Sequence, residues 1–315
     1  MHTTDSLPRR QFLKCGLVAA ALPWVNRSSA ANVPKGAEGL TTYQLGPRIW
    51  VRWNNRPLTC YRAHQSQKYP YMFPLAGPAT GLPLTTETSL PYPHHRSLFF
   101  GCDRVNGANF WQEGFSRGQI LSAGPKLGKV TKASVEILDN CTWQQPNKPP
   151  VMKDQRRVTV TAAGEELHFV DWEIVWTAVT DVQIQKTNHS LFSLRASADL
   201  TPNGGGTLIN AEGASGEKAT FGKPSPWCDF SGQRVHIDGK ITEGIAIFDH
   251  PKNPWTPCPW FTRDYGFLSP TPMNFIEETW EWPKGKSVTM RYRVVLHVGD
   301  AEVAKLDQLY RHWST

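Results

Sequence analysis

Two segments of the chain combine histidine, aspartate, asparagine, arginine and tryptophan at a density that a connecting loop does not require. They cover residues 93–111 and 248–266, and both interrupt runs that are typical of β-strands. Loops at one end of a β-sandwich converge in space, and binding residues concentrate on such loops. The sequence therefore predicts one cleft built from both segments. The residues expected to line it are His95, Asn106, Asp249, His250 and Arg263.

The expected roles follow from the chemistry of the side chains. Histidine and aspartate transfer protons near neutral pH. An ionised Asp249 needs a cationic or donor partner, which Arg263 or a protonated histidine would supply. The expected catalytic residues are His95, Asp171, Asp249 and His250. The expected substrate-binding residues are His94, Asn106, Asn109, Trp111, Arg263 and Tyr265.

Tryptophans in or beside the loops favour a carbohydrate ligand. An indole face can cover the apolar face of a sugar while amide, carboxylate and guanidinium groups bind its hydroxyls. For each tryptophan alone, packing in a sandwich core is the commoner role, so the prediction depends on their joint occurrence with polar loop residues. These tryptophans are Trp53, Trp111, Trp143, Trp227, Trp255 and Trp260.

A glycoside hydrolase would need two carboxylates, about 5 Å apart for retention or up to ~9.5 Å for inversion. Asp171 and Glu173 lie two residues apart on one strand face, which places them roughly 7 Å apart. The same pair can equally be a solvated strand face with Lys or Arg partners. Asp103, Asp249 and Asp264 are the alternatives in loops.

The histidines give a weaker indication of a metal site. His94 and His95 are adjacent, and neighbouring side chains of an extended segment point to opposite sides, so it is awkward for both to bind one ion. One of them could join Asp103, or Asp249 and His250, but no pair has the spacing of the HExxH motif. We therefore assign no metal ligands and leave the cofactor open.

The elements that position these residues are expected to be β-strands. Val170, Trp172, Ile174 and Trp176 alternate with more polar residues, which is the period of a strand with one apolar face. Gly and Pro, 25 of each in 315 residues, require many turns. Apolar residues recur at helical steps only after Asp300, which predicts a helix over 300–313. The predicted fold is all-β, a large antiparallel β-sandwich with a C-terminal helix, formed by one domain over residues 32–315.

The first 31 residues read as an export signal. Arg9-Arg10-Gln11-Phe12-Leu13-Lys14 precedes a short apolar stretch and small residues suited to cleavage, and resembles a bacterial twin-arginine signal. We expect a periplasmic or secreted protein with no transmembrane span after cleavage. Five cysteines follow the signal, and Cys228 with Cys258 is the preferred disulfide pair, with buried thiols as the alternative.

The charge distribution argues against nucleic acid as a partner. The formal net charge of the whole chain is +7, but its basic residues are scattered in pairs such as Arg156-Arg157. No run of basic residues interleaved with aromatics is present. The expected partner is a carbohydrate or another small molecule.

Several segments resemble, in order along nearly the whole mature chain, a soluble bacterial family labelled methane oxygenase PmoA. They are residues 69–78, the two loop segments, residues 169–172, Arg195 and residues 292–297. Members tend to occur among exported carbohydrate-degrading functions, so the resemblance implies a carbohydrate-active protein, whereas the label itself names a membrane subunit. The family often has Asp-His-Pro-His-His where this chain has residues 91–95, Pro-Tyr-Pro-His-His. That departure weakens any role of the motif here or transfers it to Tyr92.

A second, shorter resemblance concerns residues 187–194, Thr-Asn-His-Ser-Leu-Phe-Ser-Leu. They are similar to the histidine segment of aldose mutarotases, which are β-sandwiches that act with a His acid and a Glu base. His189 could also merely cap a strand end. The sequence therefore predicts an exported carbohydrate-active protein, a glycoside hydrolase or lyase with a loop-built site. The alternatives are a non-catalytic glycan-binding module and a sugar epimerase of mutarotase type.

Overall fold

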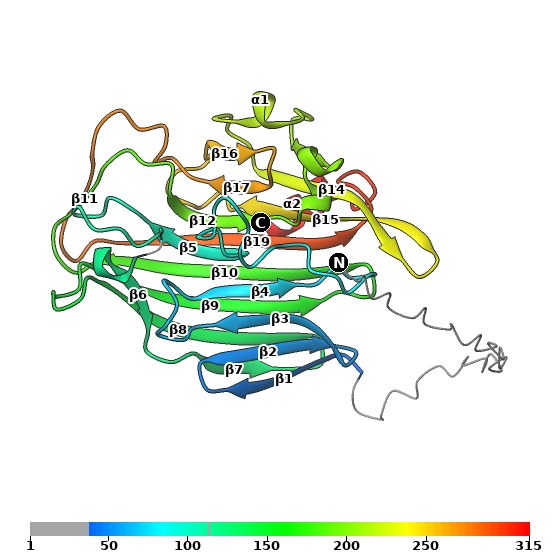
Figure 1. The fold of residues 1–315 in the computed structure, drawn as a ribbon, viewed down its shortest axis with the longest axis horizontal. Coiled ribbons are helices and arrows are strands. Elements are labelled where there is room, and N and C mark those ends of the chain that lie inside the picture. The colour runs from blue at the N-terminus through cyan, green and yellow to red at the C-terminus, as the bar shows by residue number, and fades with distance from the viewer. Residues whose placement is uncertain (1–37, 113) are drawn as a thin grey trace, which may run out of the picture. The chain divides into compact units, whose positions relative to one another are not determined.

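The computed structural model describes residues 38–112 and 114–315. The expected export signal, residues 1–31, lies outside this part of the chain. Antiparallel strands dominate the described residues, and they form two large sheets and one small one (Figure 1). The all-β prediction is confirmed. No helix in the described residues is long and apolar enough to cross a membrane.

The first large sheet has eight strands in the order β1-β2-β3-β4-β5-β12-β17-β16. The strands are β1 Leu40–Leu45, β2 Arg48–Trp53, β3 Arg56–Arg62, β4 Tyr71–Leu75, β5 Leu98–Cys102, β12 Ser190–Arg195, β17 Phe267–Pro270 and β16 Trp260–Arg263. β5 and β12 are antiparallel, with Ser190 opposite Cys102 and Leu194 opposite Leu98. Residues that lie far apart in sequence therefore meet in the middle of this sheet.

The second large sheet has nine strands. Eight follow the order β13-β14-β15-β19-β10-β9-β8-β6, and β7 also pairs with β8. They are β13 Thr207–Asn210, β14 Trp227–His236, β15 Gly239–Asp249, β19 Ser287–Val298, β10 Leu167–Ala178, β9 Met152–Ala162, β8 Ser134–Gln144, β6 Gln119–Ser122 and β7 Lys126–Val130.

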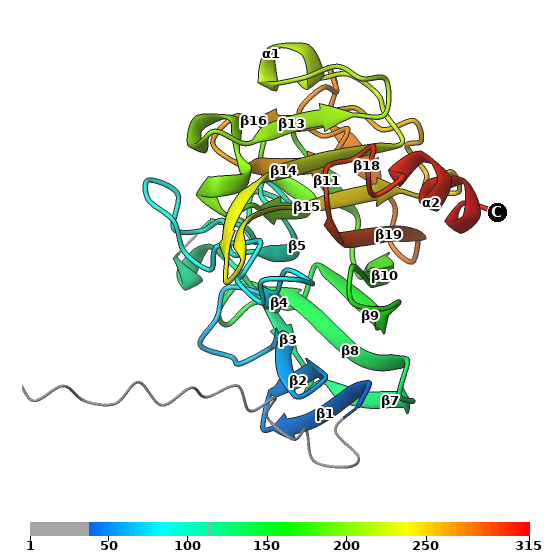
Figure 2. The ribbon, with the colours of Figure 1, turned by 90° about the vertical axis from the view of Figure 1, so that its right-hand side faces the viewer.

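The core lies between the two sheets. Along β10, Val170, Trp172, Ile174 and Trp176 are at most 1% exposed, as the alternation in sequence predicts. Trp172 lies 6.1 Å from Tyr61 of β3, between ring centroids. Figure 2 shows β2–β4 of the first sheet beside β8–β10 of the second. The buried face of β10 therefore packs against the first sheet, as in a sandwich.

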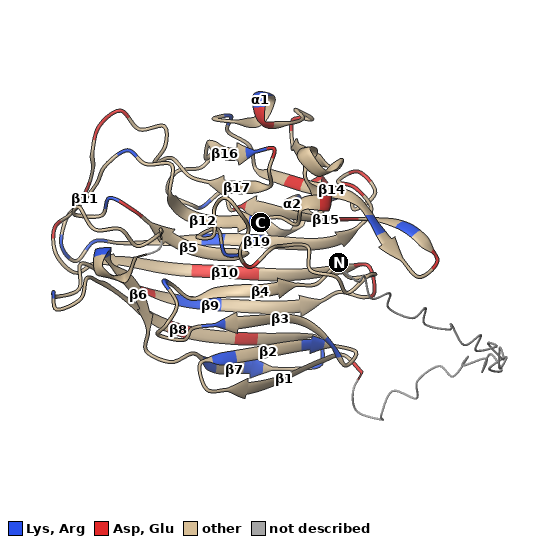
Figure 3. Ribbon diagram, viewed as in Figure 1, with Lys and Arg blue, Asp and Glu red and all other residues tan. Residues whose placement is uncertain are grey.

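The opposite face of β10 is charged. Figure 3 shows acidic residues in the middle of β10 with basic residues on β9 beside them. Asp171 binds Arg293 at 2.6 Å, and Glu173 binds Arg291 at 2.9 Å and lies 3.7 Å from Arg157. Asp171 and Glu173 thus belong to a strand face with arginine partners, the alternative to a catalytic pair.

The remaining elements are short. β11 Val182–Ile184 pairs with β18 Trp280–Trp282, and the helices are α1 Glu217–Thr220, α2 Leu306–Trp313 and the 3-10 turns Phe115–Arg117, Ala198–Leu200 and Pro202–Gly204. The C-terminal helix is confirmed, but it begins at Leu306. Asp300 instead accepts hydrogen bonds from the backbone of Glu302 and Val303 in the preceding turn.

The cysteines differ from the expected pairing. Cys60, Cys102, Cys141, Cys228 and Cys258 are all buried free thiols. Burial raises the pKa of each thiol, to about 11 for Cys60. The preferred disulfide between Cys228 and Cys258 is therefore wrong, and the buried-thiol alternative holds.

Candidate active site

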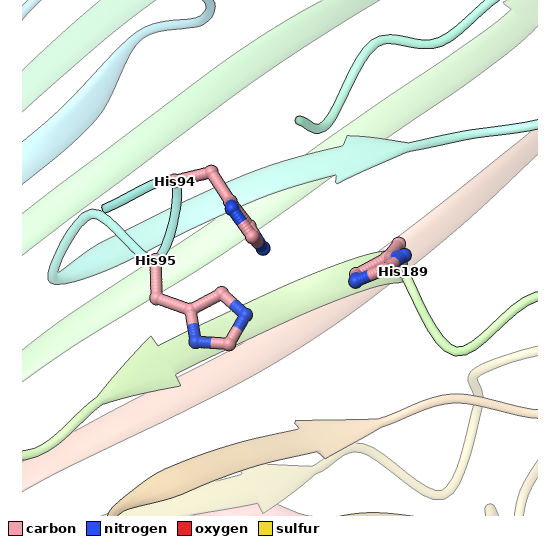
Figure 4. Close-up of side chains that lie close together, drawn as sticks. All are labelled: His94, His95 and His189. Carbon is pink, nitrogen blue, oxygen red and sulfur yellow. The ribbon is translucent and has the colours of Figure 1, made fainter. Parts of the chain in front are cut away.

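Three histidine rings converge over the first sheet. The ligand nitrogens of His94, His95 and His189 all lie within 4.8 Å of one another. The ring centroids of His94 and His95 are 4.6 Å apart, and those of His94 and His189 are 5.5 Å apart. Figure 4 shows the three rings pointing toward a common point. His94 and His189 are partly exposed while His95 is buried, so the group lies where a ligand from solvent can reach it.

A turn explains why adjacent histidines can meet. The backbone N–H of His95 donates to the carbonyl of Tyr92 at 3.1 Å, and the hydroxyl of Tyr69 donates to the carbonyl of His94. The segment is therefore not extended, and the expectation that the two side chains diverge is wrong. This turn also brings His94 back toward His189, which lies near the opposite end of the β5–β12 pair.

Asp103 positions His189 from behind. Nδ1 of His189 lies 3.5 Å from the Asp103 carboxylate, whose other oxygen accepts a hydrogen bond from the Thr187 hydroxyl. The backbone N–H of Asp103 also donates to the carbonyl of His189 at 2.9 Å. A carboxylate at Nδ1 favours a proton on that nitrogen, which leaves Nε2 for a ligand.

His95 is held in its neutral form. Burial, with contributions from His94, Arg195 and His189, lowers its pKa from 6.5 to about 2. Its ring packs on Phe267 with centroids 4.3 Å apart. His95 is therefore an uncharged hydrogen-bonding group at neutral pH, and a poor acceptor of a whole proton.

Arg195, the last residue of β12, places a cation beside His95. The residue is 5% exposed, and its backbone N–H donates to the carbonyl of Ser97 at 2.7 Å. Its guanidinium carbon lies 4.5 Å from the centroid of the Tyr265 ring. Nε and Nη1 have no hydrogen-bond partner among the described residues.

Aromatic rings complete the surroundings of the histidines. Tyr92 lies 5.2 Å from His95 and 5.1 Å from Tyr265, and Trp111 lies 5.9 Å from His189, between centroids. Tyr92 is exposed and Trp111 is fully buried. Tyr92 and Tyr265 are therefore the rings that a ligand can contact, while Trp111 supports His189.

The structure brings together only part of the predicted cleft. Two of the expected residues, His94 and His95, belong to the histidine group, and Trp111 and Tyr265 pack beside it. Arg263 instead binds Glu217 at 3.0 Å, and its guanidinium carbon lies 4.1 Å from the centroid of the Phe261 ring.

Asp249 and His250 lie at the end of β15, by the second sheet. Asp249 accepts hydrogen bonds from Asn253 at 2.7 Å and Thr256 at 3.0 Å. Burial raises its pKa from 3.8 to about 6. His250 contacts Trp313 and helps to line a pocket of about 230 Å³ that also includes Asp171. The five residues expected in one cleft are thus divided among separate places, and the catalytic roles of Asp171, Asp249 and His250 stay predictions.

The two asparagines of the first segment bind the backbone. Oδ1 of Asn106 accepts from the N–H of Gln183 at 2.7 Å, and its Nδ2 donates to the carbonyl of Asp181. Oδ1 of Asn109 accepts from the N–H groups of Trp111 and Gln112. Both side chains hold loops in place, which polar loop composition alone does not distinguish from ligand binding.

The sequence did not indicate the roles of Asp103 and Arg195 in this site. Asp103 appeared as one of several loop carboxylates and as an alternative metal ligand beside His94 or His95, and Arg195 only as part of a family resemblance. Finding them would have required the antiparallel pairing of β5 with β12, because Asp103 follows one strand and Arg195 ends the other. His189 did have a local signal, in its resemblance to the mutarotase segment.

The three histidines could also hold a transition metal ion. Neutral imidazoles are common ligands of Zn²⁺, and the Asp103 carboxylate behind His189 is the usual outer partner of a ligating histidine. The buried Arg195 cation acts against this, because it repels a dication at the same place. The three histidines thus supply ligands for a metal ion, while the charge of Arg195 opposes its binding.

No curated protein matches this chain. Among solved structures, the chain is similar to a galactose mutarotase related enzyme from Lactobacillus acidophilus, with 11% identity, a TM-score of 0.30, and coverage of 82% of this chain and 97% of the other. It is also similar to a putative kojibiose phosphorylase from the human microbiome, with 11% identity, a TM-score of 0.32, and coverage of 82% and 31%.

The family comparison corrects the resemblance drawn from the sequence. The model that matches, over residues 48–311, describes a family of unknown function, DUF6807, and not the family labelled methane oxygenase PmoA. The ordered motifs signalled membership of a family, but the label attached to them was wrong. The chain belongs to the family of unknown function DUF6807.

Proposed function

We propose that the protein is an exported enzyme that acts on a sugar by proton transfer at the histidine group, as a sugar epimerase of mutarotase type does. The observation that carries this proposal is the His189–Asp103 pair, placed beside a second reachable histidine, His94. Exposed and partly exposed tyrosines at the same site, Tyr92 and Tyr265, can stack on the apolar face of a sugar ring.

The proposed chemistry is the opening and closing of a cyclic sugar. His189, whose Nε2 is left unprotonated by the Asp103 contact at Nδ1, takes the proton of the anomeric hydroxyl while protonated His94 gives a proton to the ring oxygen. The reverse transfers close the ring on either face and regenerate both histidines. Neutral His95 binds a hydroxyl during these steps, and its low pKa suits it to that role rather than to proton uptake.

A two-carboxylate glycoside hydrolase fits this site less well. Asp103 is the carboxylate that the described contacts place there, and Thr187 and His189 already engage it. Asp171 and Glu173 lie on the second sheet with arginine partners. A retaining or inverting mechanism requires two carboxyl groups facing one glycosidic bond.

The test is the interconversion of sugar anomers by the purified mature protein. Exchange NMR on a panel of aldoses should show faster exchange with the wild type than in buffer, and His189→Asn should remove the effect. His236→Asn is the matched control, because His236 also lies near an aspartate, Asp238, at 3.8 Å, but on an exposed hairpin. Binding of sugars without exchange would instead support a glycan-binding module. Loss of activity with a chelator and its return with Zn²⁺ would support a metal enzyme.

A further inference from the structure

We propose that the histidine group takes a sugar that carries an oxyanion, a carboxylate or a phosphate, and that Arg195 binds this group. The inference rests on the proposed function, since it names the class of substrate for the same site. It is carried by an arginine that the fold buries without an opposite charge.

Arg195 is 5% exposed, yet Nε and Nη1 of its guanidinium have no hydrogen-bond partner among the described residues. Buried polar groups are normally hydrogen-bonded, and a buried charge is normally paired. Burial lowers the pKa of Arg195, and Tyr265 and Tyr92 act against this shift. None of the ion pairs formed by the described residues includes Arg195.

The acidic side chains nearby are engaged elsewhere. Asp103 binds Thr187 and His189 on the far side of the histidines. Glu217 binds Arg263. Neither carboxylate therefore pairs with Arg195, and an oxyanion on a ligand would supply the missing partner.

The position of Arg195 is fixed, and its charge acts on His95. Its backbone is held by Ser97 on one side and by Thr86, whose N–H donates to the Arg195 carbonyl at 3.0 Å, on the other. Its guanidinium lies on the Tyr265 ring, which stacks with His95 at 6.3 Å. A planar guanidinium held in this way keeps its N–H donors in fixed directions, which suits hydrogen bonds to the oxygens of a carboxylate or a phosphate.

Arg293 provides a matched control. Its guanidinium also lies over an aromatic ring, Phe169, at 4.4 Å, but Asp171 accepts hydrogen bonds from it at 2.6 and 2.8 Å. The two arginines thus differ in having or lacking a carboxylate partner. Arg195→Met and Arg293→Met remove similar volume and the same charge.

The experiment is calorimetric titration of the full mature protein with glucose, glucuronate, galacturonate and glucose 6-phosphate. We expect at least one charged sugar to bind about tenfold or more tightly than glucose, because hydrogen bonds to charged groups are the stronger ones. Arg195→Met should abolish this preference, and Arg293→Met should keep it. A uronate preference would identify a carboxylate, and preference for the phosphate ester would identify a phosphate.

Equal affinity for glucose and all charged sugars would overturn the inference while leaving the proposed function standing. A preference that survives in Arg195→Met would overturn it as well. Failure of every sugar to bind would overturn both proposals. The results therefore distinguish failure of the inference alone from failure of the proposed function. If Arg195→Met does not fold, the same preference is measured in Arg195→Lys, which keeps the charge but lacks the planar guanidinium. This variant should weaken the binding of the charged sugar selectively. An unchanged preference in Arg195→Lys would count against the assignment.

Discussion

At the scale of single residues, the site depends on a carboxylate that never needs to touch the ligand. Asp103 accepts from Thr187 and lies at Nδ1 of His189, and it is 6% exposed. In the proposed reaction, such a residue fixes the tautomer and orientation of the histidine that transfers the proton.

Replacing Asp103 therefore tests the tautomer directly. We expect Asp103→Asn to keep the fold but to reduce the rate of anomer exchange by about 100-fold or more, because an amide can present a donor to Nδ1 and move the proton to Nε2. The measurement is exchange NMR at several pH values, beside a thermal unfolding curve. A rate within twofold of the wild type, in a folded variant, would show that Asp103 does not position His189.

Asp249 gives a prediction about stability and pH. Its folded pKa, about 6, lies above the ordinary 3.8, so the folded state holds this proton more strongly than the unfolded state. The carboxyl therefore lowers stability as pH rises from about 4 to 6. We expect Asp249→Asn to raise the free energy of unfolding at pH 7.5 by about 1–3 kcal/mol, with the gain disappearing near pH 4.

Urea unfolding at pH 4 and pH 7.5 measures this difference. Asp238→Asn serves as the control, because the Asp238 side chain is 88% exposed and its replacement should leave stability almost unchanged at both pH values. A gain of the same size for Asp249→Asn at both pH values would contradict the linkage.

At the scale of elements, the strands were predictable and the turns that build the site were not. The alternation from Val170 to Trp176 reflects burial on one face, a signal that survives in a single sequence. Asn54 and Asn55 both adopt positive φ between β2 and β3, as their residue type favours in a two-residue hairpin turn. The fold class therefore follows from local patterns.

The histidine group depends instead on long-range packing. Tyr69 holds the carbonyl of His94, and Asp103 meets His189 across β5 and β12. Neither contact has a sequence spacing that would predict it. Composition alone does not show how far apart two segments lie in the fold. For this reason residues 93–111 and 248–266, similar in composition, were expected to share one cleft.

The close pairing of β14, β15 and β19 gives a prediction for a glycine. A Cβ on Gly244 of β15 would lie 2.4 Å from the ring of His297, and Nε2 of His297 lies 3.0 Å from Asp229 in the interior. We expect Gly244→Ala to destabilise the protein by ~2–4 kcal/mol, because the ring must move and break a buried pair. Chemical unfolding measures the change, and a loss below about 0.5 kcal/mol would mean that the strands shift without cost.

At the scale of the whole molecule, export remains a prediction from the first 31 residues. Replacing Arg9-Arg10 with Lys-Lys should keep the protein in the cytoplasm, since the twin-arginine route requires both arginines. Cell fractionation and immunoblotting measure this. Unchanged recovery from the periplasm would show that another signal directs the chain.

The five buried thiols have a consequence for where the domain can mature. Without disulfides among the described residues, the fold is stabilised by packing and hydrogen bonding, and neither depends on the redox potential of the surroundings. The domain can therefore complete its folding in a glutathione-rich compartment and cross into an oxidising one without any covalent rearrangement. Burial and raised pKa values keep the thiolate fraction small, so few sulfurs are reactive toward oxidants in either compartment.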